Sequence, residues 1–217
     1  MSGFVSSSTV SACRLEFAQG RAPVEIRVAL DWVTAGEQHT ITTGTVRMRA
    51  SYADPEAVHQ PPSRLSYCYH DDFSDVQGQG LLLRITDFQL PPALTQCGIG
   101  TLIWSRIHRA LDGAGLLPMQ LRGGLSSTDA TVRQVDAAGR QVRRMSHGGF
   151  YPASVPNIAR RNAFWKRMLD TAGTRFDCDA AGAGGFAGRF IDPAAHPSYR
   201  RPFDVVEIDA GMPDEST

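Results

Sequence analysis

The sequence predicts a single α/β domain in which helices flank a mixed, strongly twisted β-sheet. Three observations lead to this prediction: alternating apolar and β-branched residues over 9–52, a strand–helix–strand pattern over 81–122, and a hairpin pattern near 175–191. The 217 residues are enough for one hydrophobic core, and we expect the domain to span 1–197. Its strand-rich first part is 9–78 and its second part is 79–197, followed by a partly disordered tail at 198–217.

The first half is predicted to form antiparallel strands. We expect strands at 10–17, 23–33 and 39–52, with breaks at Gly20 and at Ala35-Gly36. Three prolines between 54 and 62 limit that stretch to one helical turn, and a short strand is expected at 65–69.

The second half changes to strand, helix and strand. Segment 81–90 has too many consecutive apolar residues to be half solvated, so we expect a central strand. A helix is predicted at 99–111, with Ser105, Arg106, His108, Arg109 and Asp112 on its exposed face. A strand at 116–122 follows, closed by Gly123-Gly124, and these lengths predict a right-handed unit with parallel strands.

The rest of the chain is predicted to add a helix and short strands. We expect a hairpin at 131–145, a second hairpin from 175–178 and 185–191, and a last strand at 203–208. Asn157 is placed to cap a helix over 158–172. The apolar face of that helix is predicted to consist of Ile158, Phe164, Trp165, Met168 and Leu169.

Charge and composition exclude several classes of protein. The chain has 22 basic and 22 acidic residues, which excludes a polycationic DNA-coating protein. Residues 96–197 nevertheless hold 13 basic against 7 acidic groups, which favours an anionic ligand. No segment approaches 18 consecutive apolar residues, and the first ten residues lack a basic stretch followed by an apolar run. We therefore expect a cytoplasmic protein with no membrane partner.

The clearest functional signal lies between strand 81–90 and helix 99–111. Gly98-Ile99-Gly100 opens the helix, and two glycines let the backbone approach a ligand closely. The free amides of the first helical turn and the helix dipole favour a phosphate or pyrophosphate. The alternative is that the glycines only tighten the turn. A Rossmann motif is excluded because Leu102 stands where a third small residue belongs, and a P-loop is excluded because Gly-Lys-Ser/Thr is absent.

Segment 81–122, with the helix at 160–176, resembles the acetyl-CoA-binding half of the GNAT N-acyltransferase superfamily. In that family a central strand precedes a turn written Gln/Arg-x-x-Gly-x-Gly/Ala, which binds the pyrophosphate of CoA. Residues 95–100 fall on this turn, with Thr95 at its first position and Gln96 beside it. The resemblance implies a GNAT-like fold, acetyl-CoA or another acyl-CoA as co-substrate, and direct acyl transfer to the amine of a small molecule or protein. The family's usual two early helices are not found before residue 80.

The resemblance also implies site residues. The cofactor-binding set is Phe88, Gln89, Leu90, Gln96, Gly98, Ile99, Gly100, Thr101 and Trp165. Asp87 lies where family members often place an acidic base, although a salt-bridged carboxylate is the structural alternative. Ser126 and Ser127 follow strand 116–122 and could position the acceptor or donate a proton through water, or only cap a turn. Trp165 replaces the tyrosine that usually protonates the departing thiolate, and an indole N–H is too weak an acid for that step.

Two other functions stay open. The chain could be a catalytically inactive CoA-binding module, or an interaction module that uses the arginine hairpin at 133–144, although nucleic acid is not the expected partner. Cys68, His70, Asp71 and Asp72 contain metal-binding atoms, but their spacing matches no metal motif, so no metal is expected. The four cysteines are isolated and are predicted to pack as small apolar side chains. A homodimer also stays open.

Overall fold

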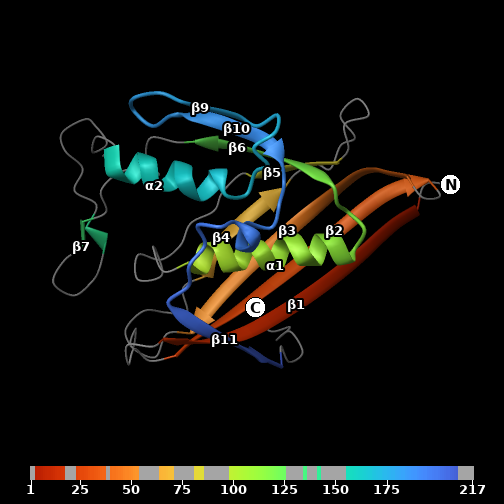
Figure 1. Ribbon diagram of the computed structural model, residues 1–217. Coiled ribbons are helices and arrows are strands. Elements are labelled where there is room, and N and C mark those ends of the chain that lie inside the picture. The colour runs from red at the N-terminus through yellow and green to blue at the C-terminus, as the bar shows by residue number, and fades with distance from the viewer. Residues whose placement is uncertain are drawn as a thin grey trace.

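The computed structural model describes residues 3–17, 23–37, 40–53, 64–70, 81–85, 98–125, 134–135, 141–142 and 155–209. Its secondary structure is mixed α/β, with two sheets, a separate two-stranded pair and few helices (Figure 1). The predicted α/β class is therefore confirmed, but the single continuous sheet is divided. No helix in these ranges is both long and apolar enough to cross a membrane.

The first sheet is antiparallel and has the strand order β11-β1-β2-β3-β4. Its strands are β1 (Gly3–Phe17), β2 (Val24–Glu37), β3 (Thr40–Ala53), β4 (Arg64–His70) and β11 (Phe203–Ile208). In β2, buried Val24, Ile26 and Val28 alternate with exposed neighbours, as a strand with one covered face requires. The predicted antiparallel strands of the first half are confirmed.

The second sheet has the order β5-β6-β10-β9. Its strands are β5 (Leu81–Ile85), β6 (Met119–Leu125), β9 (Arg175–Cys178) and β10 (Gly184–Arg189). β5 and β6 are parallel and are joined by helix α1 (Ile99–Gly113), so the predicted strand–helix–strand unit is confirmed. The hairpin β9–β10 is confirmed as well.

β5 lies at the junction of the two sheets. It ends the hydrogen-bonded order of the second sheet, and its other neighbour is β4 of the first. Only residues 81–85 of the predicted strand 81–90 are described. One predicted boundary elsewhere is wrong, because Gly123 and Gly124 belong to β6. The predicted last strand at 203–208 is confirmed as β11, which pairs with β1.

Helix α2 (Val155–Lys166) begins and ends earlier than the predicted helix 158–172. Asn157 lies inside it and is not its cap. After Lys166 the Met168 amide donates to the Trp165 carbonyl in a turn, and the Asp170 amide donates to the Arg189 carbonyl of β10. The chain therefore leaves the helical hydrogen-bond pattern at this point. Met168 and Leu169 are nevertheless buried, as predicted.

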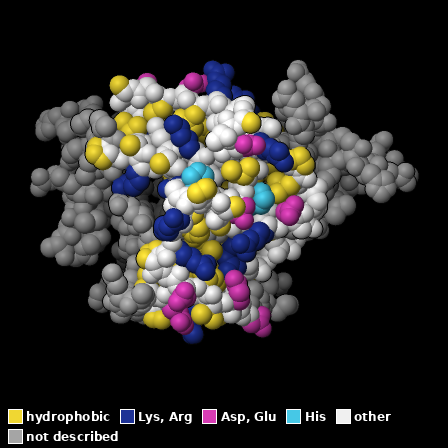
Figure 2. Space-filling model, in the orientation of Figure 1, with side chains coloured by type: hydrophobic (Ala, Val, Ile, Leu, Met, Phe, Trp, Pro, Cys, Tyr) yellow, Lys and Arg dark blue, Asp and Glu magenta, His cyan; other side chains and the backbone are white. Residues whose placement is uncertain are grey.

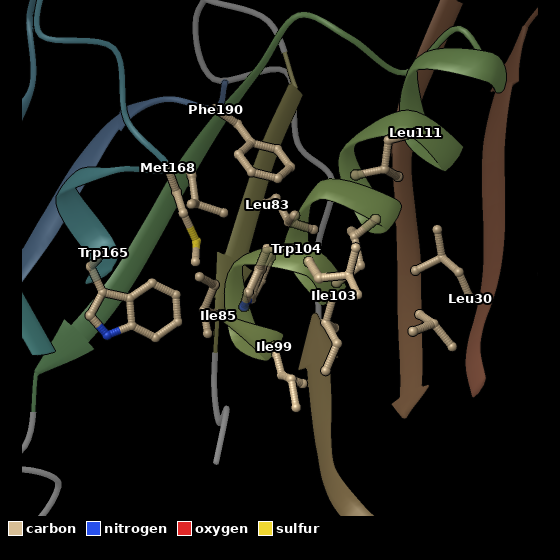
Figure 3. Packing of buried hydrophobic residues seen from close by; sticks show 14 of the residues in the cluster. Leu30, Leu83, Ile85, Ile99, Ile103, Trp104, Leu111, Trp165, Met168 and Phe190 are labelled. Atoms are coloured by element: carbon tan, nitrogen blue, oxygen red, sulfur yellow. The ribbon is translucent and has the colours of Figure 1, made fainter. Parts of the chain in front are cut away.

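The hydrophobic core lies between the helices and the two sheets. Ile99, Ile103 and Leu111 of α1 are buried between Leu83 of β5 and Leu30 of β2, so one helix covers parts of both sheets (Figure 3). α2 lies on the same side of the second sheet as α1, since the rings of Trp104 and Trp165 meet at a centroid distance of 5.8 Å.

Ser105 was expected on the exposed face of α1, but its side chain is 1% exposed. The reason is that α1 is covered on two sides, by the sheets and by the 3-10 helix η3 (Pro193–Ala195). Arg106, one residue further, reaches Glu207 of β11 with an Nη2–Oε1 distance of 2.6 Å. Burial raises the pKa of the nearby Cys13 thiol, and the Arg106 charge opposes that shift.

The predicted hairpin at 131–145 is represented by β7 (Gln134–Val135) and β8 (Gln141–Val142), which pair antiparallel.

Candidate functional site

The first turn of α1 begins at a glycine in a left-handed conformation. Gly98 adopts φ 83° and ψ −2°, a left-handed conformation that favours glycine. The first helical hydrogen bond runs from the Leu102 amide to the Gly98 carbonyl at 3.1 Å, so the three preceding amides lie ahead of the helical ladder. The first turn contains no acidic residue. The backbone therefore places the positive end of the α1 dipole at the predicted pyrophosphate turn.

Gly98 is also required by a close approach from the C-terminal part of the chain. A Cβ atom at Gly98 would lie 3.1 Å from the Arg200 carbonyl oxygen and 3.3 Å from Cε2 of Tyr199. Arg200 in turn donates from Nη1 to the carbonyl oxygens of Pro197 and Tyr199. Segment 199–201 therefore packs against the turn, a contact that the sequence did not predict. Basic side chains gather around the middle of the face that carries α1 (Figure 2).

The first turn of α1 is largely buried. Ile99, Gly100 and Thr101 are all buried, with Thr101 2% exposed. The first turn of α1 is therefore enclosed by the rest of the fold.

Most of the predicted site residues lie outside the described residues. These are Asp87, Phe88, Gln89, Leu90, Gln96, Ser126 and Ser127, and their roles stay predictions. The described strands that precede them end at Ile85 and Leu125, at the same edge of the parallel pair. In open α/β sheets, ligands bind at the carboxyl ends of parallel strands.

Trp165 lies in an aromatic cluster. Its ring stacks on Phe186 of β10 at a centroid distance of 5.0 Å, and Phe164 meets it edge to face at 5.0 Å. With 7% exposure, the indole is a core side chain in this structure.

A second feature is an open groove of about 710 Å³ on the second sheet. Its lining includes three arginines, one from each of three strands: Arg84, Arg122 and Arg175. Gly124 and Gly185 carry no side chain and so leave room beside the arginines. Asp177 is the acidic residue among the lining residues. This groove was not predicted from the sequence. The signal available was a single arginine inside each of two apolar strands, LLLRI and MQLRGGL.

The other predicted candidates are not assembled into a site by the described residues. Cys68 and His70 belong to β4, whereas Asp71 and Asp72 are not described. Within the ranges that the structure covers, no group of three or more metal-binding side chains is found. Arg140, Arg143 and Arg144 lie outside these ranges.

Comparison with known proteins finds no matching family model, no matching curated protein and no matching solved structure.

His108 differs from its predicted exposed position. It is half-buried on α1, and its ring meets Phe190 edge to face at a centroid distance of 5.0 Å. Burial lowers the pKa of His108 below its ordinary value of 6.5, although the carboxylates of Asp192 and Asp112 act in the opposite direction.

This pKa shift predicts an acid-sensitive fold. Because the folded state disfavours the charged imidazole, the unfolded chain binds more protons below pH 6.5. The contribution of His108 to stability is therefore complete above pH 6.5 and is lost as the pH falls below it. We expect the melting temperature to drop between pH 7 and pH 5, and to drop less steeply in His108→Gln.

The control is His196→Gln, which leaves the contact between His108 and Phe190 in place and should keep the steeper native dependence. Equal slopes in the native protein and His108→Gln would contradict the prediction.

Proposed function

We propose that this protein is an acyl-CoA-dependent N-acyltransferase with a GNAT-like fold, which transfers an acyl group to an amine by direct attack. The observation that carries the proposal is the start of α1: left-handed Gly98 opens a helix that follows a parallel strand and presents its first amides. That arrangement suits the pyrophosphate of CoA.

The order of the remaining elements supports the proposal. β5, α1 and β6 are followed by α2 and the hairpin β9–β10, and β10 lies between β6 and β9. A strand, glycine turn, helix, parallel strand, aromatic helix and final hairpin are the elements that the GNAT resemblance implies.

In the proposed reaction, residues of this chain would bind and orient the substrates. The amides of Ile99 to Thr101 would hold the pyrophosphate, and the backbone of 88–90 would pair with the pantetheine arm and polarise the thioester carbonyl. Asp87 would accept the proton of the attacking amine, whose nitrogen forms the new bond to the acyl carbon as the C–S bond breaks. Because Trp165 is not an acid at neutral pH, the leaving thiolate would take its proton from water held by Ser126 or Ser127.

Binding and turnover are tested separately. We expect acetyl-CoA to bind in calorimetric titration and to protect the amides of 98–102 from hydrogen exchange. A panel of amines is then screened for release of the free thiol of CoA. Binding with thiol release supports the transferase. Binding without release for any amine identifies a catalytically inactive CoA-binding module, and absence of binding contradicts both.

Two glycines at opposite ends of α1 provide a matched pair of variants. Gly98 and Gly115 have φ values of 83° and 70°, so an alanine at either one carries a similar backbone strain of about 1–2 kcal/mol. The Cβ atom of Gly98→Ala would also lie 3.1 Å from the Arg200 carbonyl oxygen, whereas that of Gly115→Ala would meet nothing within 4 Å, so the melting temperatures of both variants are measured beside their affinities. Only Gly98 belongs to the proposed binding turn. We expect Gly98→Ala to weaken acetyl-CoA binding by roughly tenfold or more, and Gly115→Ala to bind as the native protein does. Equal affinities in two folded variants would assign Gly98 a purely structural role.

A further inference from the structure

Two glycines face each other inside the second sheet. Gly124 of β6 is paired with Gly185 of β10, in a register that runs without a shift along both strands. β6 lies between β5 and β10, and β10 lies between β6 and β9, so neither glycine belongs to an edge strand. A glycine at such a position weakens a strand, and it marks a bulge, a barrel corner or a place where a ligand or another backbone comes close. The regular register excludes a bulge, and the four-stranded sheet is not a barrel.

The fold itself does not require a glycine at position 124. Neither Gly124 nor Gly185 has a positive φ. A Cβ atom at Gly124 would meet no atom within 4 Å, and one at Gly185 would lie 3.3 Å from the Gly123 carbonyl oxygen, a contact that a small shift relieves. Conformation and packing therefore leave Gly124 unexplained, and the close approach of a ligand remains as the reason for it.

The two glycines line the open groove of about 710 Å³, a volume within the range of small-molecule sites. The next pair along the strands, Gly123 and Phe186, points to the opposite face, where Phe186 stacks on Trp165 of α2. The glycine pair therefore lies on the face that α2 does not cover, and Gly124 is exposed there. Two adjacent strands without side chains present their peptide groups as a flat surface, which we call the glycine floor.

One arginine beside the glycine floor is available to a ligand. Arg122 lies two residues from Gly124 and so points to the same face, in a row with the other two arginines of the groove. Arg175 is paired with Asp177 at an Nε–Oδ2 distance of 2.7 Å. Arg84 has an interaction of its own, so no role is assigned to it. Arg122 is exposed, and within the described ranges no hydrogen bond or ion pair joins it to another side chain, so it offers a ligand one positive charge.

We propose that this groove binds an aromatic carboxylate, with the ring on the glycine floor and the carboxylate held by Arg122. A flat ring contacts the peptide groups over its whole face, whereas a puckered ring of the same size touches them only in part. The guanidinium group offers two parallel N–H donors, which match the two oxygens of one carboxylate. The site does not depend on the proposed acyl transfer.

The probe is benzoate, titrated into the full chain and followed by amide NMR. We expect the amide signals of residues 122–125 and 184–187 to shift and to saturate. Cyclohexanecarboxylate and acetate carry the same charge without a flat ring, and we expect them to bind roughly tenfold more weakly than benzoate. Equal affinity for cyclohexanecarboxylate would overturn the assignment of an aromatic ring. Absence of shifts at these amides up to about 10 mM benzoate would overturn the site itself.

Two variants test the glycine floor and the arginine separately. Gly124→Leu fills the groove from a position where the fold has space, so we expect benzoate binding to be lost and the melting temperature to be kept. Gly113→Leu is its matched control, since a Cβ atom at Gly113 also meets nothing within 4 Å. We expect Arg122→Gln to weaken benzoate binding roughly ten- to a hundredfold. Arg14→Gln changes an exposed strand arginine of the first sheet and should leave the affinity unchanged.

Each variant can contradict the proposal. Benzoate that binds Gly124→Leu as tightly as the native protein would show that the ring does not lie on the glycine floor. An unchanged affinity in Arg122→Gln would show that Arg122 does not hold the carboxylate, and this second variant decides the matter if Gly124→Leu does not fold. An equal loss of binding in Gly113→Leu or Arg14→Gln would likewise place the ligand outside the groove.

Discussion

Replacing Trp104 with alanine is expected to lower the free energy of unfolding by about 3–5 kcal/mol. Trp104 is fully buried and meets the rings of Trp165 and Phe190 edge to face, at centroid distances of 5.8 and 5.9 Å. These contacts connect α1 to α2 and to the residue that follows β10 (Figure 3). Truncation would leave a cavity at the point where all three meet, and the rigid rings around it can fill only part of that space.

Urea denaturation monitored by circular dichroism measures this loss. The control is Val206→Ala on β11, since Val206 is an apolar side chain with 37% exposure. Its change in the free energy of unfolding should stay within about 0.5 kcal/mol. A loss of less than about 1 kcal/mol in Trp104→Ala would show that Trp104 is not central to the core.

Adding one methyl group at Gly123 is expected to cost about 1–3 kcal/mol of stability. A Cβ atom there would overlap the Phe186 ring, with Cε1 at 2.8 Å. That ring is held between Trp165 and Phe176, with which it stacks at 5.0 and 5.9 Å. Because both neighbours restrict it, the ring cannot move aside without disturbing the cluster.

The adjacent glycine provides the matched control. Gly124 points to the other face of β6, where an added Cβ atom meets nothing within 4 Å. We expect Gly124→Ala to be neutral or to stabilise the fold by up to about 1 kcal/mol, since it reduces the freedom of the unfolded chain. Similar melting temperatures for Gly123→Ala and Gly124→Ala would be inconsistent with this packing.

Local patterns predicted most of the elements. Alternation in β2 and the apolar spacing of α1 are set by side chains near one another in the sequence, so strands, the main helix and the hairpin at 175–191 could be found. Helix ends were harder: Asn157 has the character of a cap, yet the helix begins at Val155. Contacts with distant segments decided which polar residues of the helix are buried. Ser105 and His108 are polar residues on a helix that is covered on two sides.

The two candidate sites also differ in whether a local sequence pattern could reveal them. The glycine turn at the start of α1 is a local motif, so its place before the helix could be predicted, whereas the packing of Arg200 and Tyr199 against Gly98 could not. The arginine groove depends on the register of β5, β6 and the hairpin β9–β10, which are far apart in the chain, and no spacing in the sequence reveals that Arg84, Arg122 and Arg175 share a row. Similarly, only the structure shows why Gly123 must lack a side chain.

The pairing of β1 with β11 has a consequence for synthesis on the ribosome. β1, β2 and β3 follow one another in the chain and can pair as they emerge. The other edge of β1 at Cys13 is covered only after Glu207 of β11 has been synthesised. Until then the nascent protein carries an open strand edge, the feature through which unfinished chains associate with one another. The arrangement makes completion of this sheet a late event, after the helices and the second sheet have left the ribosome.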